Sequence, residues 1–423
     1  MEGGMSLWRS ISRRGRSGCA VPFLNRTAQL LRPLREMVAA YLRPMNKQSP
    51  FPLSILCLSE SWGGLELNTA RFAGWMRARG WPVQVITRAG SPLAARAAEL
   101  GATVVALDNR WKALDVPAAG RLAGLLRGFG TGALLISRNG DLGLAVLCKR
   151  LFLPKLPLIY QQHMQLGLAK RGLVHTLRYR ALAAWLAPLP GLARQVLEKT
   201  RLPADRLHVV PLGVELEKFA DEQLTTAEAR RQLNLTLPPE TVLLGLIGRL
   251  DDGKGQDFVV EALAGLRRQF PQLHLLLVGE PTRNEGTAYA DALHARIRAL
   301  NLTDVVHLRG FTPQPEVAYR ALDISITAST NETYGMVTIE ALAAARPVLG
   351  AAAGGTRELL ADNRTGLLFT LRDEDSFGAA VARLLREPGL RERLGREGQR
   401  EALATYSHHR QCELTEEILR AVV

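Results

Sequence analysis

LSILCLSESWGGLELNTARFAGWMRARG, residues 53–80, contains the first strand-and-helix unit of the chain. Its apolar start, Leu53 to Leu58, predicts a buried strand, and Gly63 and Gly64 then lead into a helix from about Leu65 to Arg79. Gly80 follows as a common residue for ending a helix. Because short apolar runs and longer amphipathic stretches keep alternating after this unit, the sequence predicts a parallel sheet covered by helices.

The alternation forms two series, which suits 423 residues because single domains typically hold roughly 100 to 200. A charged passage that ends in a proline pair, about 215–240, separates the series and predicts a linker. We therefore expect an α/β protein with two doubly wound, Rossmann-like domains. The last stretch, about 392–423, predicts a helix. The remaining expected strands are Val83–Ile86, Thr103–Leu107, Ala133–Ile136, Leu158–Gln161 and Leu207–Val210, then Val242–Ile247, Leu273–Val278, Val305–Leu308, Ile324–Thr327 and Pro347–Gly350.

The positive charge of the chain is unevenly distributed. The net charge is +14, and residues 1–50 hold +7 of it, with eight Arg and one Lys against Glu2 and Glu36. The modest excess in the remaining residues suits a protein that handles diphosphates or works near an anionic membrane. The sequence has no groove-reading helix and no RNA-binding aromatic signature, so we expect no nucleic-acid partner.

Residues 1–50 are compatible with three interpretations. Arg and Ser enrichment with few acids suits a transit peptide, and apolar residues between arginines suit an amphipathic membrane-surface segment. The third, which we favour, is a dispensable upstream extension, because Met45 stands just before the globular pattern begins. No uninterrupted apolar run of about 18 residues occurs, so we expect a cytoplasmic protein, with peripheral contact at the inner membrane face as an option. Four widely spaced cysteines predict free thiols.

Two glutamates eight positions apart, Glu332 and Glu340, follow a predicted strand. The segment between them should run from a loop into a helix. This places the N–H groups of Gly335, Met336 and Val337 at a helix N-terminus, where a phosphate binds well. Two glutamates alone are more often a loop carboxylate and one that complements the helix dipole. The glycine and the preceding strand favour a binding site.

A second loop carries two cations. GRLDDGKG, residues 248–255, follows the first strand of the second series, and it contains Arg249 and Lys254. On such a loop the two side chains can hold a diphosphate and offset the charge that builds on a leaving group. Asp251 and Asp252 are adjacent and lie inside this loop, so they do not match a D-x-D metal site. We predict no metal and no cofactor.

These two segments resemble the E-x7-E and G-R-x4-K-G motifs of glycosyltransferase family 4, the retaining group 1 glycosyltransferases with the GT-B fold. By that resemblance Glu332 contacts the donor sugar, Glu340 holds the nucleotide ribose, and Arg249 and Lys254 hold the diphosphate. The resemblance also implies two domains facing across a cleft, 51–215 and 216–405, with a C-terminal helix, 406–423, that returns to the first. Weaker matches at the family's expected places are Pro211–Val214, Gly279, Gly354–Gly355 with Glu358, and Asn363–Phe369.

The first half adds three candidates. Gly63 and Gly64 can let the backbone approach the donor diphosphate or the acceptor, and a simple turn is an equal alternative. His163 follows the strand Leu158–Gln161, at the end where open α/β sheets bind ligands. Family members often carry a histidine near this place that touches the donor sugar, although a lone histidine is more often structural.

The sequence departs from the family pattern at two places. Ala345 stands where a glycine is common, and Ala187–Pro190 replaces a more usual serine-containing strand end, which leaves the acceptor open. The resemblance implies a hexosyltransferase that moves a sugar from a nucleoside-diphosphate sugar to a glycan or lipid-linked acceptor, in cell-envelope polysaccharide or lipopolysaccharide synthesis. The alternatives are another GT-B enzyme, such as a sugar phosphorylase or a nucleotide-sugar epimerase, and a silent scaffold that docks on membranes.

Overall fold

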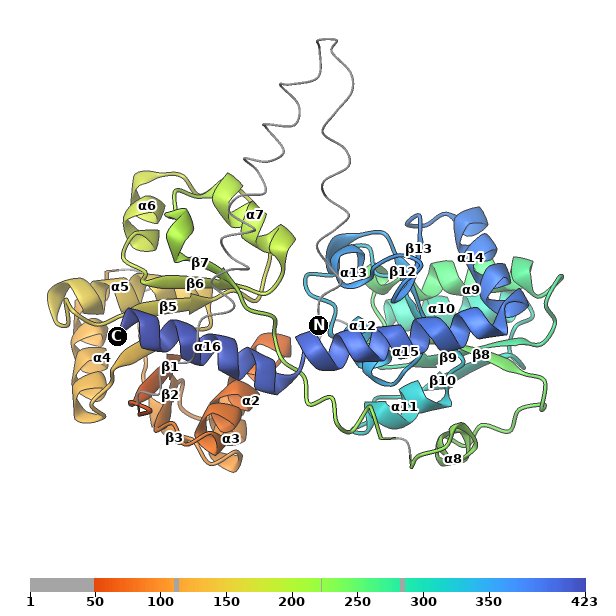
Figure 1. The fold of residues 1–423 in the computed structure, drawn as a ribbon, viewed down its shortest axis with the longest axis horizontal. Helices are drawn as coiled ribbons and strands as arrows, with labels where there is room; N and C mark the ends of the chain where they lie inside the picture. The colour runs from red at the N-terminus through yellow and green to blue at the C-terminus, as the bar shows by residue number, and fades with distance from the viewer. Residues whose placement is uncertain (1–48, 110–113, 222, 282–285) are drawn as a thin grey trace, which may run out of the picture. The chain divides into compact units, whose positions relative to one another are not determined.

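The structure is a computed structural model that describes residues 49–109, 114–221, 223–281 and 286–423. The predicted extension, residues 1–50, lies almost wholly outside the described residues. Residues 49–423 form one compact unit that contains two parallel sheets, of seven and six strands (Figure 1). The prediction of two Rossmann-like α/β halves is therefore confirmed.

The first sheet has the order β3-β2-β1-β4-β5-β6-β7, and all of its strands are parallel. The chain moves outward in one direction through β1, β2 and β3 and then returns to the other side of β1, which makes the β1/β4 boundary a switch point. Most of these strands are buried along their whole length because helices cover both faces of a parallel sheet. The strands are β1 (Leu53–Leu56), β2 (Val83–Thr87), β3 (Thr103–Ala106), β4 (Ala133–Ile136), β5 (Leu158–Gln161), β6 (Ala184–Ala187) and β7 (Leu207–Val209).

Two helices of the first half begin with side-chain caps. Ser91 and Asp115 each accept a hydrogen bond from a backbone N–H of the helix that follows, and a proline occupies the first turn of both helices. The helices are α2 (Gly64–Ala78), α3 (Pro92–Glu99), α4 (Val116–Gly128), α5 (Leu142–Leu151), α6 (Leu173–Tyr179) and α7 (Pro190–Lys199).

The second sheet repeats this plan with the order β10-β9-β8-β11-β12-β13. Its switch point lies between β8 and β11. The strands are β8 (Val242–Ile247), β9 (Leu273–Val278), β10 (Val306–Arg309), β11 (Ile324–Thr327), β12 (Val348–Ala351) and β13 (Gly366–Phe369). The helices are α8 (Thr226–Gln232), α9 (Gln256–Leu266), α10 (Ala288–Ala299), α11 (Pro315–Ala321), α12 (Met336–Ala343), α13 (Gly354–Leu359), α14 (Glu374–Arg386), α15 (Pro388–Thr405) and α16 (His408–Val422).

Three local predictions were wrong. The predicted linker 215–240 contains a helix, α8, which packs on α11 through Ala229, Val317 and Ala321. The strands β6 and β13 were missed, because β6 is a short run of small residues around Trp185 and β13 opens with Gly366. The single helix expected over about 392–423 is in fact two helices, α15 and α16, since Ser407 caps α16 by accepting a hydrogen bond from the N–H of Arg410.

The C-terminal helix α16 packs against the first half. It lies on α2, and Cys412, Leu414 and Leu419 join the hydrophobic cluster around β1 and β2. Arg79, the C-cap residue of α2, also forms an ion pair with Glu416 at 2.5 Å. A backbone bridge between Val214 and Ser407 joins the two segments in which the chain passes between the sheets. These contacts tie the end of the chain to the first sheet (Figure 1).

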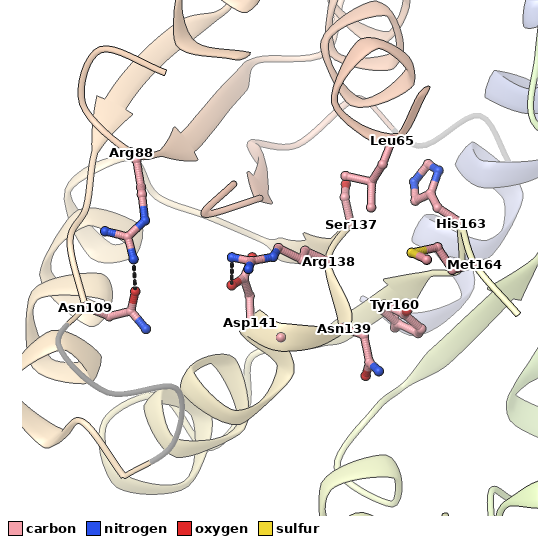
Figure 2. Close-up of a pocket in the computed structure, with 11 residues that line it drawn as sticks. Leu65, Arg88, Asn109, Ser137, Arg138, Asn139, Asp141, Tyr160, His163 and Met164 are labelled. Carbon is pink, nitrogen blue, oxygen red and sulfur yellow. Dashed lines mark hydrogen bonds and ion pairs between the residues drawn. The ribbon is translucent and has the colours of Figure 1, made fainter. Parts of the chain in front are cut away.

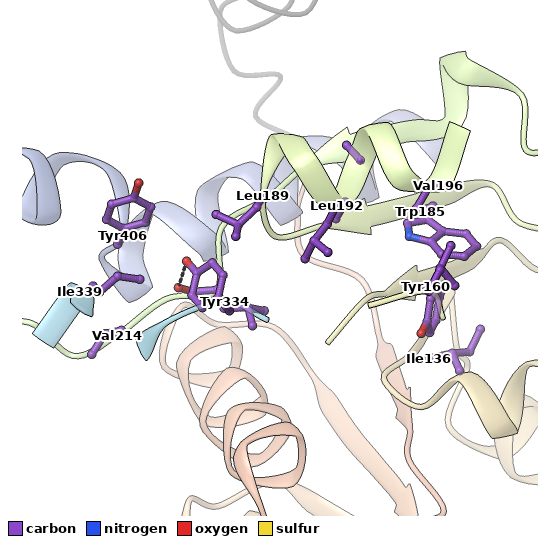
Figure 3. Close-up of a cluster of buried hydrophobic side chains, with 14 of the residues drawn as sticks. Ile136, Tyr160, Trp185, Leu189, Leu192, Val196, Val214, Tyr334, Ile339 and Tyr406 are labelled. Carbon is purple, nitrogen blue, oxygen red and sulfur yellow. Dashed lines mark hydrogen bonds between the residues drawn. The ribbon is translucent and has the colours of Figure 1, made fainter. Parts of the chain in front are cut away.

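One buried hydrophobic cluster contains residues of both halves. Tyr334 and Ile339, from the second half, belong to the same cluster as Leu189 and Val214 from the first (Figure 3). The hydroxyl of Tyr334 donates to the backbone oxygen of Leu212 at 2.8 Å. Because Tyr334 lies between the two predicted glutamates, this packing also holds the segment that carries them. Within the described part of the chain, no helix is long and apolar enough to cross a bilayer.

Candidate active site

The loop after β8 stands at the switch point of the second sheet. It holds Arg249, then a single 3-10 turn over Asp252–Lys254, and it ends at Gly255, where α9 begins. Gly255 has a φ of 76°, and a Cβ there would lie 2.5 Å from the backbone oxygen of Ala328. Only glycine fits this turn. The loop after β8 is therefore packed directly against the end of β11, which leads to Glu332.

Lys254 and Glu332 meet across this switch point. The Nζ of Lys254 lies 2.7 Å from Oε2 of Glu332, and their side chains are only 24% and 16% exposed. The N–H of Thr330 also donates to the backbone oxygen of Gly253 at 2.9 Å, so the two loops are joined by backbone as well as by charge. Arg249 leads from the same loop and is more exposed, with Asp251 as an ion-pair neighbour at 3.9 Å.

Gly354 and Gly355 fix the backbone of Glu332. The N–H of Gly355 donates to the backbone oxygen of Glu332 at 2.7 Å. A Cβ on Gly354 would lie 2.4 Å from that same oxygen, so a larger residue would displace the glutamate. The glycine pair, a weak match in sequence, has a clear physical role because it holds Glu332 in place.

Helix α12 begins directly after Gly335. Gly335 is its N-cap residue with a φ of 98°, and Met336 and Val337 form the first turn. Their N–H groups are among those that have no partner within a helix, and they add to the positive end of the helix dipole. The structure thus places the three residues where the sequence predicted, at a helix N-terminus that suits a phosphate.

Glu340 lies one turn further along α12 and contacts a residue that the sequence did not reveal. Its Oε2 accepts a hydrogen bond from the hydroxyl of Tyr319 at 3.0 Å. Burial raises the pKa of Glu340 to about 7, although this hydrogen bond favours the ionised form. Glu340 therefore titrates near neutral pH, and its free carboxylate oxygen is suited to accept hydroxyl groups.

A pocket of about 310 Å³ lies at the corresponding switch point of the first sheet. Figure 2 shows its lining, which comes from the start of α2, the loops after β2, β3 and β4, the 3-10 turn before α5, and β5 with the loop that follows it. His163 lies in this wall. Burial lowers its pKa to about 4, so the ring is neutral at pH 7. The Nε2 of His163 is buried and has no hydrogen-bond partner among the described residues.

Asp141 and Arg138 also line this pocket and were not predicted. Asp141 accepts a hydrogen bond from the N–H of Leu58 at 2.8 Å, and Arg138 donates to the backbone oxygen of the same residue. The two side chains lie 3.6 Å apart (Figure 2). Burial raises the pKa of Asp141 to about 6. Their spacing gave no signal, because their partner Leu58 is 80 positions away from Arg138 and 83 from Asp141.

Gly63 and Gly64 precede and begin helix α2, as expected. Neither position needs glycine for the fold: Gly63 has an extended backbone, and a Cβ on Gly64 would meet no atom within 4 Å. Leu65, the next residue, lines the pocket. The approach of a ligand to these two glycines stays a prediction.

The two halves are joined by hydrogen bonds close to the candidate residues. Gln165, two positions after His163, donates to Asn331 at 3.0 Å, and Asn331 adjoins Glu332. Glu358 accepts a hydrogen bond from the N–H of Gly191 at 2.6 Å. The candidates therefore fall into two groups, one around Lys254, Glu332 and Glu340 and one around His163. The hydrogen bond between Gln165 and Asn331 links the two groups.

Two family models match the chain, one in each half. Residues 62–218 match "Glycosyltransferase Family 4", and residues 228–401 match "Glycosyl transferases group 1". The first match spans His163, and the second spans Arg249, Lys254, Glu332 and Glu340.

Curated relatives match over part of their length. Proteins named D-inositol 3-phosphate glycosyltransferase are 33% identical over 223 residues in Kineococcus radiotolerans (49% of this chain, 50% of the relative) and 36% over 196 residues in Frankia alni (45% and 47%). The chain thus spans about half the length of the curated relatives it matches.

Solved structures match over almost the whole described chain. A glycosyltransferase from Rickettsia africae superimposes with a TM-score of 0.80 at 17% identity, covering 89% of this chain and 99% of that one. The Anabaena protein HepE in complex with UDP gives 0.76 at 20% identity, covering 88% and 100%. At this identity the likeness shows the fold. The family assignment comes from the two family models, which together span both halves and show that the chain belongs to the family 4, group 1 glycosyltransferases.

Proposed function

We propose that this glycosyltransferase transfers a sugar from a nucleoside-diphosphate sugar to a glycan or lipid-linked acceptor with retention at the anomeric carbon, in cell-envelope polysaccharide or lipopolysaccharide synthesis. The observation that carries the proposal is the Lys254–Glu332 pair at the switch point of the second sheet. Ligands of open α/β sheets bind at such points. The loop that carries Lys254 offers a cation to the diphosphate, and the loop that carries Glu332 offers a mostly buried carboxylate to the sugar hydroxyls.

The proposed roles follow from the placement of each group. Arg249 and Lys254 bind the donor diphosphate, and the N-terminus of α12 at Gly335 faces its negative charge. Glu340 accepts the ribose hydroxyls. Glu332 contacts hydroxyls of the donor sugar, and its ion pair with Lys254 holds both side chains ready in the same place.

The chemical step needs no nucleophile from the protein. The bond between the anomeric carbon and the donor phosphate oxygen breaks, and the acceptor oxygen forms its bond on the same face. The acceptor proton passes to the departing phosphate. Negative charge grows on the leaving diphosphate, so Arg249, Lys254 and the helix N-terminus stabilise the transition state more than the bound donor. We propose that transfer needs no metal, because these groups supply the positive charge.

The pocket of the first half is proposed to receive the acceptor and the near side of the donor sugar. The neutral His163 can donate or accept one hydrogen bond to a sugar hydroxyl, and Gly63 and Gly64 leave the backbone open beside it. Because the matched relatives are named for inositol 3-phosphate, a phosphorylated polyol belongs in any acceptor panel. We place the reaction in the cytoplasm, with peripheral contact at the inner membrane face.

Thermal unfolding of the full chain with UDP, GDP, ADP, CMP and inorganic phosphate tests the donor site. A ligand that binds only the folded state stabilises it, by about 2.7 kcal/mol at 100 times its Kd. We expect a shift with one nucleoside diphosphate, which identifies the base. No shift with any of them would favour a silent scaffold. A phosphate requirement would favour a phosphorylase, and a changed free nucleotide sugar would favour an epimerase.

A further inference from the structure

The positive charge of the described chain is concentrated in one segment. Residues 142–204, which run from α5 through α7, contain ten Lys and Arg residues and a single acidic residue, Glu198. This segment alone carries +9, whereas residues 51–423 as a whole carry +7. The rest of both halves is therefore slightly acidic. An excess confined to one segment of one half points to a surface with its own anionic partner.

Exposed apolar side chains gather in the same segment. Leu168 is 83% exposed, Leu173 74% and Val174 64%, and Leu151, Met164 and Leu177 are exposed as well. Single exposed apolar residues are ordinary, but six within 27 positions form a group that a soluble surface rarely shows. Met164 lines the pocket of the first half, but neither candidate site explains the exposure of the other five.

Helix α6 orients these side chains. Thr176 and Tyr179 face inward and are buried, whereas Leu173, Val174 and Leu177 are exposed. Three cations lie beside them: Lys170 and Arg171 precede the helix, and Arg178 lies in its last turn. Lys170 and Arg178 are partly exposed, as is His175, whose pKa is lowered by burial. Apolar residues flanked by Lys and Arg are the pattern of a helix that lies in a membrane interface.

Hydrogen bonds hold this region in place. Arg150, at the end of α5, donates to the backbone oxygen of Leu177 at 3.3 Å. Lys199, at the end of α7, donates to the backbone oxygen of Leu166 at 2.6 Å, and the N–H of Lys170 donates to the backbone oxygen of Lys199 at 2.7 Å. The loop before α6 is thereby fixed to α7 (Figure 1), and its apolar residues stay outside although the loop is well anchored.

We propose that this surface, formed by Leu168, Lys170, Leu173, Val174, Leu177 and Arg178, docks on an anionic lipid membrane. The apolar side chains enter the interface between headgroups and acyl chains, and the cations bind anionic headgroups. The chain's own N-terminal segment is a poor occupant, because residues 1–50 carry +7 and repel a surface of the same sign. A nucleic acid would use the charges but leave the exposed leucines in water.

The proposal deepens the membrane contact proposed above, yet its test does not depend on catalysis. The full chain is sedimented with vesicles of phosphatidylglycerol mixed with phosphatidylcholine, and with vesicles of phosphatidylcholine alone. One variant carries Leu173→Gln and Val174→Gln, and a second carries Lys170→Gln and Arg178→Gln. Phe311→Gln is the control for the first, since Phe311 is also 72% exposed but lies in the other half. Arg268→Gln with Arg298→Gln, both on exposed positions of the second half, controls the second.

We expect binding to the anionic vesicles only. Each cation near such a surface contributes about 1 kcal/mol, so the Lys170/Arg178 variant should bind about 30-fold more weakly. The Leu173/Val174 variant should lose about tenfold or more. Both controls should bind as the wild type does, and raising the salt from 0.1 to 1 M should weaken binding because the screening length falls from about 10 to about 3 Å.

Three results would overturn the proposal. The first is that the full chain does not bind anionic vesicles. The second is that both surface variants bind them as tightly as the wild type does. The third is that the chain binds a single-stranded oligonucleotide tightly but does not bind vesicles. Equal binding would assign the contact to another segment, such as 1–50. Nucleotide-dependent stabilisation should be the same in all four variants, so a failed docking test and a failed donor site give different results.

Discussion

Replacing Lys254 with Ala tests the donor site most sharply. The change removes an ammonium 2.7 Å from Glu332, in a pair whose side chains are 24% and 16% exposed. If Lys254 also stabilises the departing diphosphate, losing this one group should cost about 3 to 4 kcal/mol of transition-state stabilisation, or roughly 10²- to 10³-fold in kcat. The free energy of unfolding should fall by only about 1 to 2 kcal/mol, because the pair keeps some contact with water.

The chain offers a matched control for this variant. Arg230 and Asp323 also pair at 2.7 Å, with side chains 19% and 29% exposed, in the same half but away from the loop after β8. Arg230→Ala should lose at least as much stability and keep its turnover. Initial rates of donor consumption and urea unfolding are measured on both variants. Wild-type kcat in Lys254→Ala, with a stability loss like that of Arg230→Ala, would show that the lysine is only half of a structural ion pair.

Three further predictions concern other residues of the site. Burial raises the pKa of Glu340 to about 7, and only its ionised form accepts two ribose hydroxyls, so nucleotide affinity should fall about tenfold from pH 8 to pH 6. Calorimetric titration of the wild type with the nucleotide measures this fall. Glu340→Gln should bind the nucleotide weakly at both pH values. His163→Ala should lower kcat/KM about tenfold, because it removes one hydrogen bond to the sugar. The wild-type pH–rate profile should show no ionisation of this histidine between pH 5.5 and 8, since its pKa is about 4. A step in that profile that His163→Ala removes would contradict a neutral ring. Gly335 has a φ of 98°, and a Cβ there would lie 2.8 Å from Leu359, so Gly335→Ala should lower the free energy of unfolding by about 1 to 2 kcal/mol. Gly64→Ala should keep its stability, and it should lose turnover if a ligand contacts the backbone there. Unfolding curves measure the stability of both variants, and initial rates measure their turnover.

The parts of the site that lie close together in sequence were the predictable ones. The loop after β8 and the segment from Glu332 to Glu340 each carry their glycine, charge and helix start within about ten residues, so a strand-to-helix reading places them correctly. Ala345, where the sequence departs from the family pattern, has an unusual backbone conformation. It adopts a φ of 55°, the left-handed region, which is why glycine is common at this position.

The parts of the site formed by distant residues could not be predicted. Tyr319 reaches Glu340 from another helix, and Asp141 reaches the N–H of Leu58 from the 3-10 turn that follows the neighbouring strand β4. Such pairs depend on strand order, and one sequence does not define the order in which parallel strands lie. The exposed leucines of α6 were hidden for a different reason, because the sequence pattern of an interfacial helix is the same as that of a helix packed on a core.

Proton NMR of the transfer reaction distinguishes retention from inversion at the anomeric carbon. The full chain is incubated with α-linked nucleoside-diphosphate sugars and a panel of glycan, lipid-linked and phosphorylated polyol acceptors, and the anomeric proton of the product is followed together with the released nucleotide. The account predicts an α-linked product and one nucleoside diphosphate released for each sugar transferred, with this signal strongly reduced in Lys254→Ala. A β-linked product, or a sugar transferred only when inorganic phosphate is present, would contradict it.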